Sequence, residues 1–292
     1  MNDKRIYTGD INIQIKEYEN DGETVIFLHF GDGNLMMWQK VVPFFQDNYH
    51  LILVDLRGHG KSDKPAEGYH IDDTAHDVVM VMKELGIKKA HVVGSSLGAE
   101  TGLSMAANYP SKILSLVLDG ALFSNFGPYG LWEGTEDEFN AHAVQVLEKM
   151  RNAPKKLYPS VDALVKESRE DFEKHGWWSD TFEAVKRYGA IKNEEGKYKS
   201  CWSDIAEEYT KNYFFYKLED YYQKIKCPVL MLPDEIPGQD ENEKRVMESL
   251  FKLLENGKIV NVPGLIHPFG WMLEPEGACN AVLDFLDDIR EK

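Results

Sequence analysis

Short runs of apolar, β-branched residues alternate with amphipathic stretches through the first 120 residues, and this alternation limits the possible folds most strongly. Thr24 to Phe30 and Leu51 to Asp55 are continuous apolar runs, as expected for strands buried on both faces of a parallel sheet. Asp72 to Leu85 places apolar residues on one helical face, and Gly86 follows as a stop signal. Strand and helix in this order predict a doubly wound, mostly parallel α/β sheet.

The same alternation of strand-like and helix-like stretches continues to about residue 120 and returns after residue 225. Additional strands are predicted at Ala90 to Gly94, Ile113 to Leu118, Cys227 to Leu232 and Lys258 to Val262, and a half-buried one around Ile11, Ile13 and Ile15. Additional helices are predicted at Leu97 to Tyr109, Asn242 to Leu254 and Glu276 to Ile289. We therefore expect one discontinuous α/β core made of residues 1–122 and 225–292.

The segment between the two core pieces, residues 123–224, differs from them in composition and in hydrophobic pattern. It holds 20 of the chain's 34 aromatic residues, and strand-like runs give way to helical spacing. We expect a helical, aromatic-rich lid. Its aromatic side chains can serve as the thin core of a small subdomain, line an apolar pocket, or do both.

Composition narrows the class of partner. The 292 residues carry 33 Lys and Arg against 49 Asp and Glu, a formal net charge of −16, which disfavours nucleic acid and anionic membranes. Three scattered cysteines with no C-x-x-C pair indicate neither a disulfide framework nor a zinc site. With no apolar signal core or long apolar run, the expectation is a cytoplasmic protein that acts on a small molecule.

Gly94-Ser95-Ser96-Leu97-Gly98 is a G-x-S-x-G pattern lying between a predicted strand and a predicted helix. A serine on such a sharp turn needs neighbours without side chains, which Gly94 and Gly98 provide. The turn would expose the Ser96 hydroxyl and aim the Leu97 amide at a developing oxyanion. Ser96 is therefore the candidate nucleophile.

Several motifs in order make the chain resemble the α/β-hydrolase superfamily, outside the lid. Besides the serine pattern, Asp55 to Ser62 resembles the D-x-R-G-x-G-x-S turn of that superfamily, and Val262 to His267 resembles the segment that carries its catalytic histidine. The resemblance implies an α/β-hydrolase fold with a serine nucleophile. A serine at this position differs from the aspartate of the haloalkane dehalogenase and epoxide hydrolase branches.

His267 is the candidate general base among nine histidines. It follows the last predicted strand, in a loop that opens at the carboxyl edge of the sheet, where Ser96 is also expected. The resemblance implies the same assignment.

The carboxylate that orients the histidine is less well defined by the sequence. The superfamily pattern aligned from the strand Val229 to Leu232 falls on Pro237, and counted back from His267 it falls on Gln239, next to Asp240. Asp240 is therefore preferred. Alternatives are Asp234 and Glu235, just past the strand, and Asp119, at the end of the preceding strand, which we interpret first as a turn former.

The second oxyanion donor is expected in the loop His29-Phe30-Gly31, which resembles the superfamily's H-G-x loop. Phe30 stands where a glycine is usual, and Gly31 aligns with the donor. The Gly31 and Leu97 amides are the proposed pair.

Together these residues predict a serine hydrolase that cleaves ester-like bonds through an acyl-enzyme, without metal or organic cofactor. A carboxylesterase-like activity is preferred, while lactone, amide or carbon–carbon hydrolysis and perhydrolysis reuse the same groups. The alternatives are a hydrolase-derived protein that binds a small ligand with little turnover, and a non-catalytic interaction module.

Overall fold

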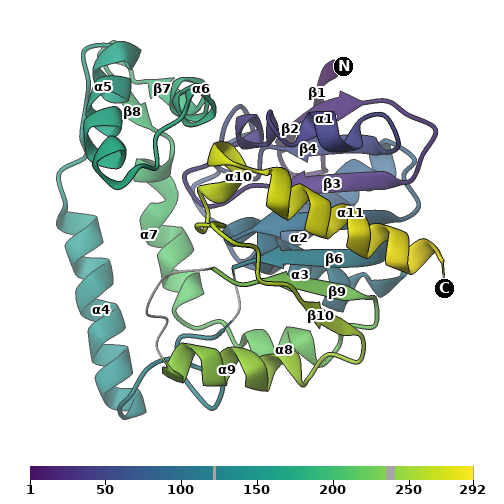
Figure 1. Ribbon diagram of the computed structural model, residues 1–292. Coiled ribbons are helices and arrows are strands. Elements are labelled where there is room, and N and C mark those ends of the chain that lie inside the picture. Colours follow the sequence, from purple (N-terminus) through teal and green to yellow (C-terminus); the bar gives the residue numbers. More distant parts are fainter. Residues whose placement is uncertain (121–122, 235–240, 292) are drawn as a thin grey trace.

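The computed structural model describes residues 1–120, 123–234 and 241–291, and its main element is an eight-stranded sheet. The strand order is β1-β2-β4-β3-β5-β6-β9-β10, with parallel pairing from β4 to β10 and antiparallel pairing at β1 and β2 (Figure 1). The predicted α/β class with a mostly parallel sheet is confirmed. The strands are β1 (Asn2–Tyr7), β2 (Asn12–Tyr18), β3 (Thr24–Leu28), β4 (His50–Val54), β5 (Ala90–Ser95), β6 (Ile113–Asp119), β9 (Val229–Leu232) and β10 (Gly257–Ile259).

Each central strand is buried on both faces, which explains its continuous apolar run. On β3, Ile26 and Leu28 point into one hydrophobic cluster while Val25 and Phe27 point into a second cluster on the opposite face. This alternation follows from the two-residue period of a strand. The sheet therefore has two separate cores, one beneath each helix layer.

Helices cover both faces of the sheet (Figure 1). Among the described residues, the Ile26 cluster and the Val25 cluster each take buried side chains from four helices. The first group is α2 (Ile71–Glu84), α3 (Leu97–Asn108), α8 (Leu218–Tyr222) and α9 (Glu241–Phe251); the second is α1 (Val42–Phe45), α6 (Asp180–Gly189), α10 (Gly270–Leu273) and α11 (Glu276–Arg290). Short 3₁₀ turns in the described residues are η1 (Leu35–Trp38), η2 (Pro110–Lys112) and, within the inserted segment, η3 (Glu173–His175).

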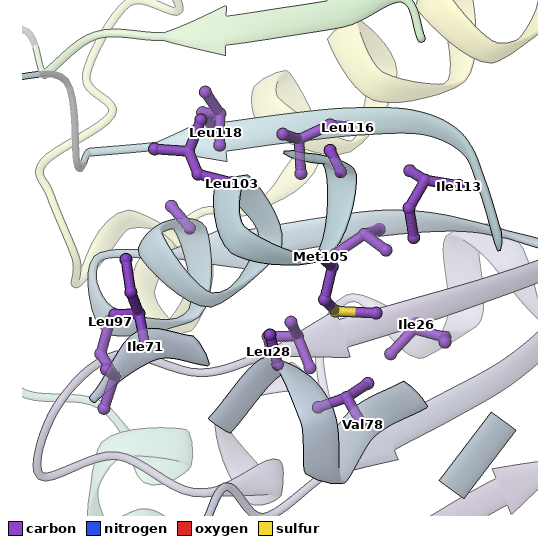
Figure 2. Packing of buried hydrophobic residues seen from close by; sticks show 14 of the residues in the cluster. Ile26, Leu28, Ile71, Val78, Leu97, Leu103, Met105, Ile113, Leu116 and Leu118 are labelled. Carbon is purple, nitrogen blue, oxygen red and sulfur yellow. The ribbon is translucent and has the colours of Figure 1, made fainter. Parts of the chain in front are cut away.

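Helix α3 is the best-buried helix of the first layer. Figure 2 shows Leu103 next to Leu118, and Met105 pointing toward Ile26 and Val78 of the same cluster. Leu103 and Met105 are both fully buried. This packing fixes the helix that starts directly after Ser96.

Residues 123–224 contribute the helices that stand beside the sheet on the left of Figure 1, with one difference from expectation. The segment includes a small antiparallel hairpin as well as helices. Its turn, Asn193 to Gly196, is short, polar and has Gly196 at φ 82°, which suits a hairpin connection. The elements are α4 (Glu136–Asn152), α5 (Val161–Phe172), α6 (Asp180–Gly189), β7 (Ala190–Lys192), β8 (Tyr198–Ser200) and α7 (Trp202–Tyr213).

Two further features of the fold were not expected from the sequence. Strand β1 pairs with β2 although its residues are mostly exposed, so it shows little apolar signal. At the end of the insertion, Tyr216, Leu218 and Tyr222 pack into the Ile26 cluster of the core. Among the residues described, no helix is both long and apolar enough to cross a bilayer.

The packing of α3 makes a stability prediction. Leu103→Ala should lower the free energy of unfolding by about 2–5 kcal/mol, because it removes buried methyl groups and leaves a cavity. Val144→Ala on α4, where the side chain is 54% exposed, should change it by less than about 0.5 kcal/mol. Urea denaturation followed by circular dichroism measures both. Equal effects of the two substitutions would contradict this description of the core.

Candidate active site

Ser96 occupies a sharp turn between β5 and α3. Its φ is 51° and ψ is −117°, a region that residues with a side chain rarely adopt. A Cβ added at Gly94 would lie 2.3 Å from the Gly98 carbonyl oxygen, and one added at Gly98 would lie 2.1 Å from the Leu28 carbonyl oxygen. Both glycines are therefore required by close backbone contacts, and the turn has the geometry expected of a nucleophile elbow.

His267 lies at the same edge of the sheet and is held by a buried carboxylate. Its Nδ1 donates a hydrogen bond to Asp119 Oδ1 at 2.9 Å. The Asp119 main-chain oxygen accepts a hydrogen bond from the Ser96 amide at 2.7 Å, so Asp119 contacts both candidate residues. Because Nδ1 carries the proton, Nε2 is left as the basic nitrogen of the neutral ring.

Asp119 is fully buried, and its carboxylate is well supplied with donors. Oδ2 accepts hydrogen bonds from Ser95 Oγ at 2.6 Å and from Trp271 Nε1 at 2.8 Å. A buried carboxylate without such donors would be costly. The three donors fix its orientation toward the imidazole.

A carboxylate other than the preferred Asp240 contacts the imidazole ring. Asp240, the preferred residue, and Glu235 lie outside the described residues. Asp234 accepts a hydrogen bond from the His267 backbone amide at 3.1 Å, and Asp119 is the carboxylate on the ring. The interpretation of Asp119 as a simple turn former is replaced by this contact. Strand register is the signal that could have pointed to Asp119, because Asp119 pairs with Ser95, the residue before Ser96, on the neighbouring strand.

The imidazole sits directly against Gly120. A Cβ at this position would lie 2.3 Å from His267 Cε1, and Gly120 has φ 74°. Both the close approach and the left-handed backbone therefore require glycine here.

The His267 charge state is set by two opposing effects. Burial alone would lower the pKa of the imidazole, but the charge and hydrogen bond of Asp119 raise it above its usual value. The protonated form that a general base reaches during a reaction is therefore stabilised at this position.

The candidate oxyanion loop is organised by a buried histidine. His29 Nε2 accepts a hydrogen bond from the Leu56 amide at 3.0 Å, and its Nδ1 donates to the Phe30 carbonyl at 2.7 Å. Burial lowers the pKa of His29 well below its usual value, which keeps the ring neutral and this tautomer fixed. The loop that carries Gly31 is therefore held to the turn after β4.

The two candidate oxyanion donors lie on this loop and at the start of α3. Within the described ranges, neither the Gly31 nor the Leu97 amide donates a hydrogen bond to another residue. Phe30, which replaces the usual glycine, packs edge-on against Phe269, two residues after His267, with ring centroids 6.2 Å apart. The departure at Phe30 thus adds an aromatic contact between the oxyanion loop and the histidine loop.

The inserted segment reaches the oxyanion loop through polar and aromatic contacts. Asp32, at φ 62°, accepts hydrogen bonds from Lys186 Nζ and from Ser200 Oγ, both at 2.5 Å. The Trp202 indole lies over Gly31: a Cβ added at Gly31 would be 3.0 Å from Trp202 Cη2. These contacts were not anticipated from the sequence, since they join residues about 150 or more positions apart.

Asp55 of the D-x-R-G-x-G-x-S turn connects three segments. Its carboxylate accepts hydrogen bonds from the Leu35 and Lys61 amides, both at 2.8 Å, and from the Tyr188 hydroxyl at 3.0 Å. Burial raises the pKa of Asp55 to about 6. This motif therefore supports the loops around the site. Among the described residues, no group of three His, Cys, Asp or Glu side chains is arranged to hold a metal ion.

The contact between Gly120 and the imidazole makes a testable prediction. Gly120→Ala should displace the ring from Asp119 and lower the pKa of His267, measured by NMR titration. Gly86→Ala is a matched control, because Gly86 has a similar φ of 71° but no atom within 4 Å of an added Cβ. Gly86→Ala introduces the strain of a side chain at positive φ without any contact with His267, so it should leave the pKa of His267 unchanged. An unchanged pKa in Gly120→Ala would show that the ring does not depend on this contact.

Comparison with known proteins agrees with this geometry. The family model described as the alpha/beta hydrolase fold matches residues 23–232. The chain is 26% identical over 288 residues to the 2-(acetamidomethylene)succinate hydrolase of Mesorhizobium japonicum, covering 97% of this chain and 95% of the relative. It is also 26% identical to 3-oxoadipate enol-lactonase 2 of Acinetobacter baylyi, covering 83% and 84%.

A solved structure gives the same result. The crystal structure of an E-2-(acetamidomethylene)succinate hydrolase superposes with a TM-score of 0.76 at 25% identity, covering 98% of both chains. The match of the family model extends over more than half of the sequence, from before β3 to the end of β9. The chain belongs to the α/β-hydrolase superfamily and is, at that level of description, a hydrolase.

Proposed function

We propose that this protein is a serine hydrolase that cleaves an ester-like bond of a small, partly apolar substrate through an acyl-enzyme. The observation that carries the proposal is the Asp119 side chain, which bonds His267 Nδ1 while its backbone oxygen bonds the Ser96 amide. This arrangement brings a nucleophile elbow and an oriented imidazole to one edge of the sheet. A carboxylate on His267 Nδ1 weighs against the alternative of a ligand-binding protein with little turnover, which rested on the doubtful position of the acid.

In the proposed mechanism, Ser96 Oγ attacks the substrate carbonyl carbon while His267 Nε2 takes the hydroxyl proton. The carbonyl oxygen becomes an oxyanion that accepts hydrogen bonds from the Gly31 and Leu97 amides. Collapse of this intermediate expels the alcohol, which receives the proton from His267. Water then attacks the acyl-enzyme by the same route, releasing the carboxylic acid and restoring Ser96.

Residues 123–224 serve in this proposal as a lid over the reacting groups. Trp202 on the Gly31 side and an aromatic group around Phe269 on the histidine side provide apolar surface near the site. Such surfaces suit an aliphatic or aromatic substrate body. The succinate hydrolase and enol-lactonase relatives act on different named compounds, so linear esters and lactones are both included in the tests.

The nucleophile is tested by covalent labelling. A fluorophosphonate probe should label the protein, and Ser96→Ala should abolish the labelling while leaving the circular dichroism spectrum unchanged. Ser95→Ala is a harsher comparison, because it removes a hydrogen bond to Asp119 but leaves the nucleophile, so labelling should slow without disappearing. Absence of labelling in folded wild-type protein would contradict the enzyme assignment.

The acid is tested by kinetics on p-nitrophenyl esters of varied chain length and on simple lactones. Asp119→Asn should lower kcat by about 10²–10⁴-fold, because it favours the wrong imidazole tautomer. Asp240→Asn and Asp234→Asn should each have much smaller effects, since Asp119 occupies Nδ1. A large loss in Asp240→Asn with near-normal turnover in Asp119→Asn would return the acid to Asp240.

A further inference from the structure

One buried carboxyl beside the nucleophile has no part in the proposed mechanism. Glu100 lies one helical turn after Ser96 on α3, and its amide donates a hydrogen bond to the Ser96 carbonyl at 3.0 Å. The Glu100 residue is only 2% exposed. Acidic side chains are almost never buried this completely unless they have a specific partner.

The partner comes from the inserted segment. The Tyr209 hydroxyl on α7 donates a hydrogen bond to Glu100 Oε2 at 2.6 Å. Burial raises the pKa of Glu100 to about 7, against the Tyr209 hydrogen bond and the His267 charge, which lower it. The carboxyl therefore changes its charge near neutral pH.

The groups that interact electrostatically with Glu100 are three tyrosines, of which Tyr216 is buried and Tyr209 and Tyr213 are partly buried, and the His267 imidazole. Burial raises the pKa of Tyr209 well above its usual value and that of Tyr213 to about 12, and it also raises the pKa of Tyr216. All three phenols stay neutral near pH 7. In the described part of the chain, His267 is thus the one group that titrates in the same range and interacts with Glu100.

Helix α7 connects Glu100 to the oxyanion side of the site. Its first residue, Trp202, lies over Gly31, and the Trp202 and Tyr209 rings are 5.3 Å apart. The same helix face therefore contacts the candidate oxyanion loop at one end and the nucleophile helix at the other. The Glu100 carboxyl and the His267 imidazole shift each other's pKa, so the carboxyl acts electrostatically on a charge at the candidate site.

We propose that Glu100, held by Tyr209, is a specificity-determining residue whose buried negative charge selects neutral acyl groups over acyl groups that carry a carboxylate. This inference rests on the proposed hydrolase function. Two like charges in a poorly solvated site repel more strongly than in water, and such repulsion is an effective way to reject a competing ligand. The same charge stabilises the His267 imidazolium, an effect that both kinds of substrate share.

The sign of the pH dependence follows from the Glu100 titration. Below about pH 7 the carboxyl becomes protonated and neutral, so the repulsion of an anionic acyl group weakens. Above that pH it is ionised, and discrimination reaches its full value. His267 serves both kinds of substrate, so its own titration cancels in the ratio of their rates.

The test compares two esters of equal chain length, 4-nitrophenyl hexanoate and mono-4-nitrophenyl adipate, whose free carboxylate is ionised throughout. In wild-type protein, the ratio of kcat/KM for hexanoate over adipate should rise roughly tenfold from about pH 6 to about pH 8.5. In Glu100→Gln the ratio should be low and independent of pH. Glu208→Gln is the matched control, because this α7 carboxylate pairs with Lys211 at the surface, and its ratio should follow wild type.

The outcomes separate the two proposals. A ratio in wild type that does not change with pH, or a Glu100→Gln ratio equal to that of wild type, would overturn the role of Glu100 while leaving the hydrolase assignment in place. Failure to hydrolyse either ester, together with no fluorophosphonate labelling, would overturn the proposed function and this inference with it. The wild-type pH series needs no variant, so the test does not depend on the folding of Glu100→Gln.

Discussion

The buried carboxylate of Asp119 is the constraint on which the site depends. It lies at the end of β6 and accepts hydrogen bonds from the residue before the candidate nucleophile (Ser95), from the candidate base (His267) and from helix α10 (Trp271). Burying this charge is tolerable because each of these donors offsets part of its lost hydration. The elbow, the histidine loop and α10 therefore form one hydrogen-bonded unit, and displacing any of them leaves the carboxylate less well compensated.

A second set of contacts joins the inserted segment to the core around the same edge. Lys186 and Ser200 bind Asp32, Tyr188 binds Asp55, and Tyr209 binds Glu100. Each of these three carboxyl groups of the core thus receives a hydrogen bond from residues 123–224. Removing the segment would leave these carboxyl groups without those hydrogen-bond donors. The aromatic-rich segment and the α/β core therefore depend on each other, although their sequences differ in character.

The parts that the sequence predicted are those with local causes. Ser96 is identified by glycines two residues away on either side, and the buried strands by continuous apolar runs, so neighbouring residues carry the information. His267 needed the position of its loop as well. Asp119 could not be chosen in this way, because its role comes from pairing across strands with Ser95 and from a contact 148 residues away in sequence. The β7–β8 hairpin and the exposed strand β1 were missed because they bury little apolar surface.

The central claim is that Asp119 holds His267 in the tautomer with the proton on Nδ1, leaving Nε2 as the base for Ser96. NMR of protein labelled with ¹⁵N-histidine tests this directly, at a pH where the ring is neutral, because the nitrogen shifts distinguish the two tautomers. We expect an Nδ1–H form for His267, with a downfield Nδ1 proton that is lost in Asp119→Asn. A His267 ring protonated on Nε2, or an Nδ1 proton that persists unchanged in Asp119→Asn, would contradict it.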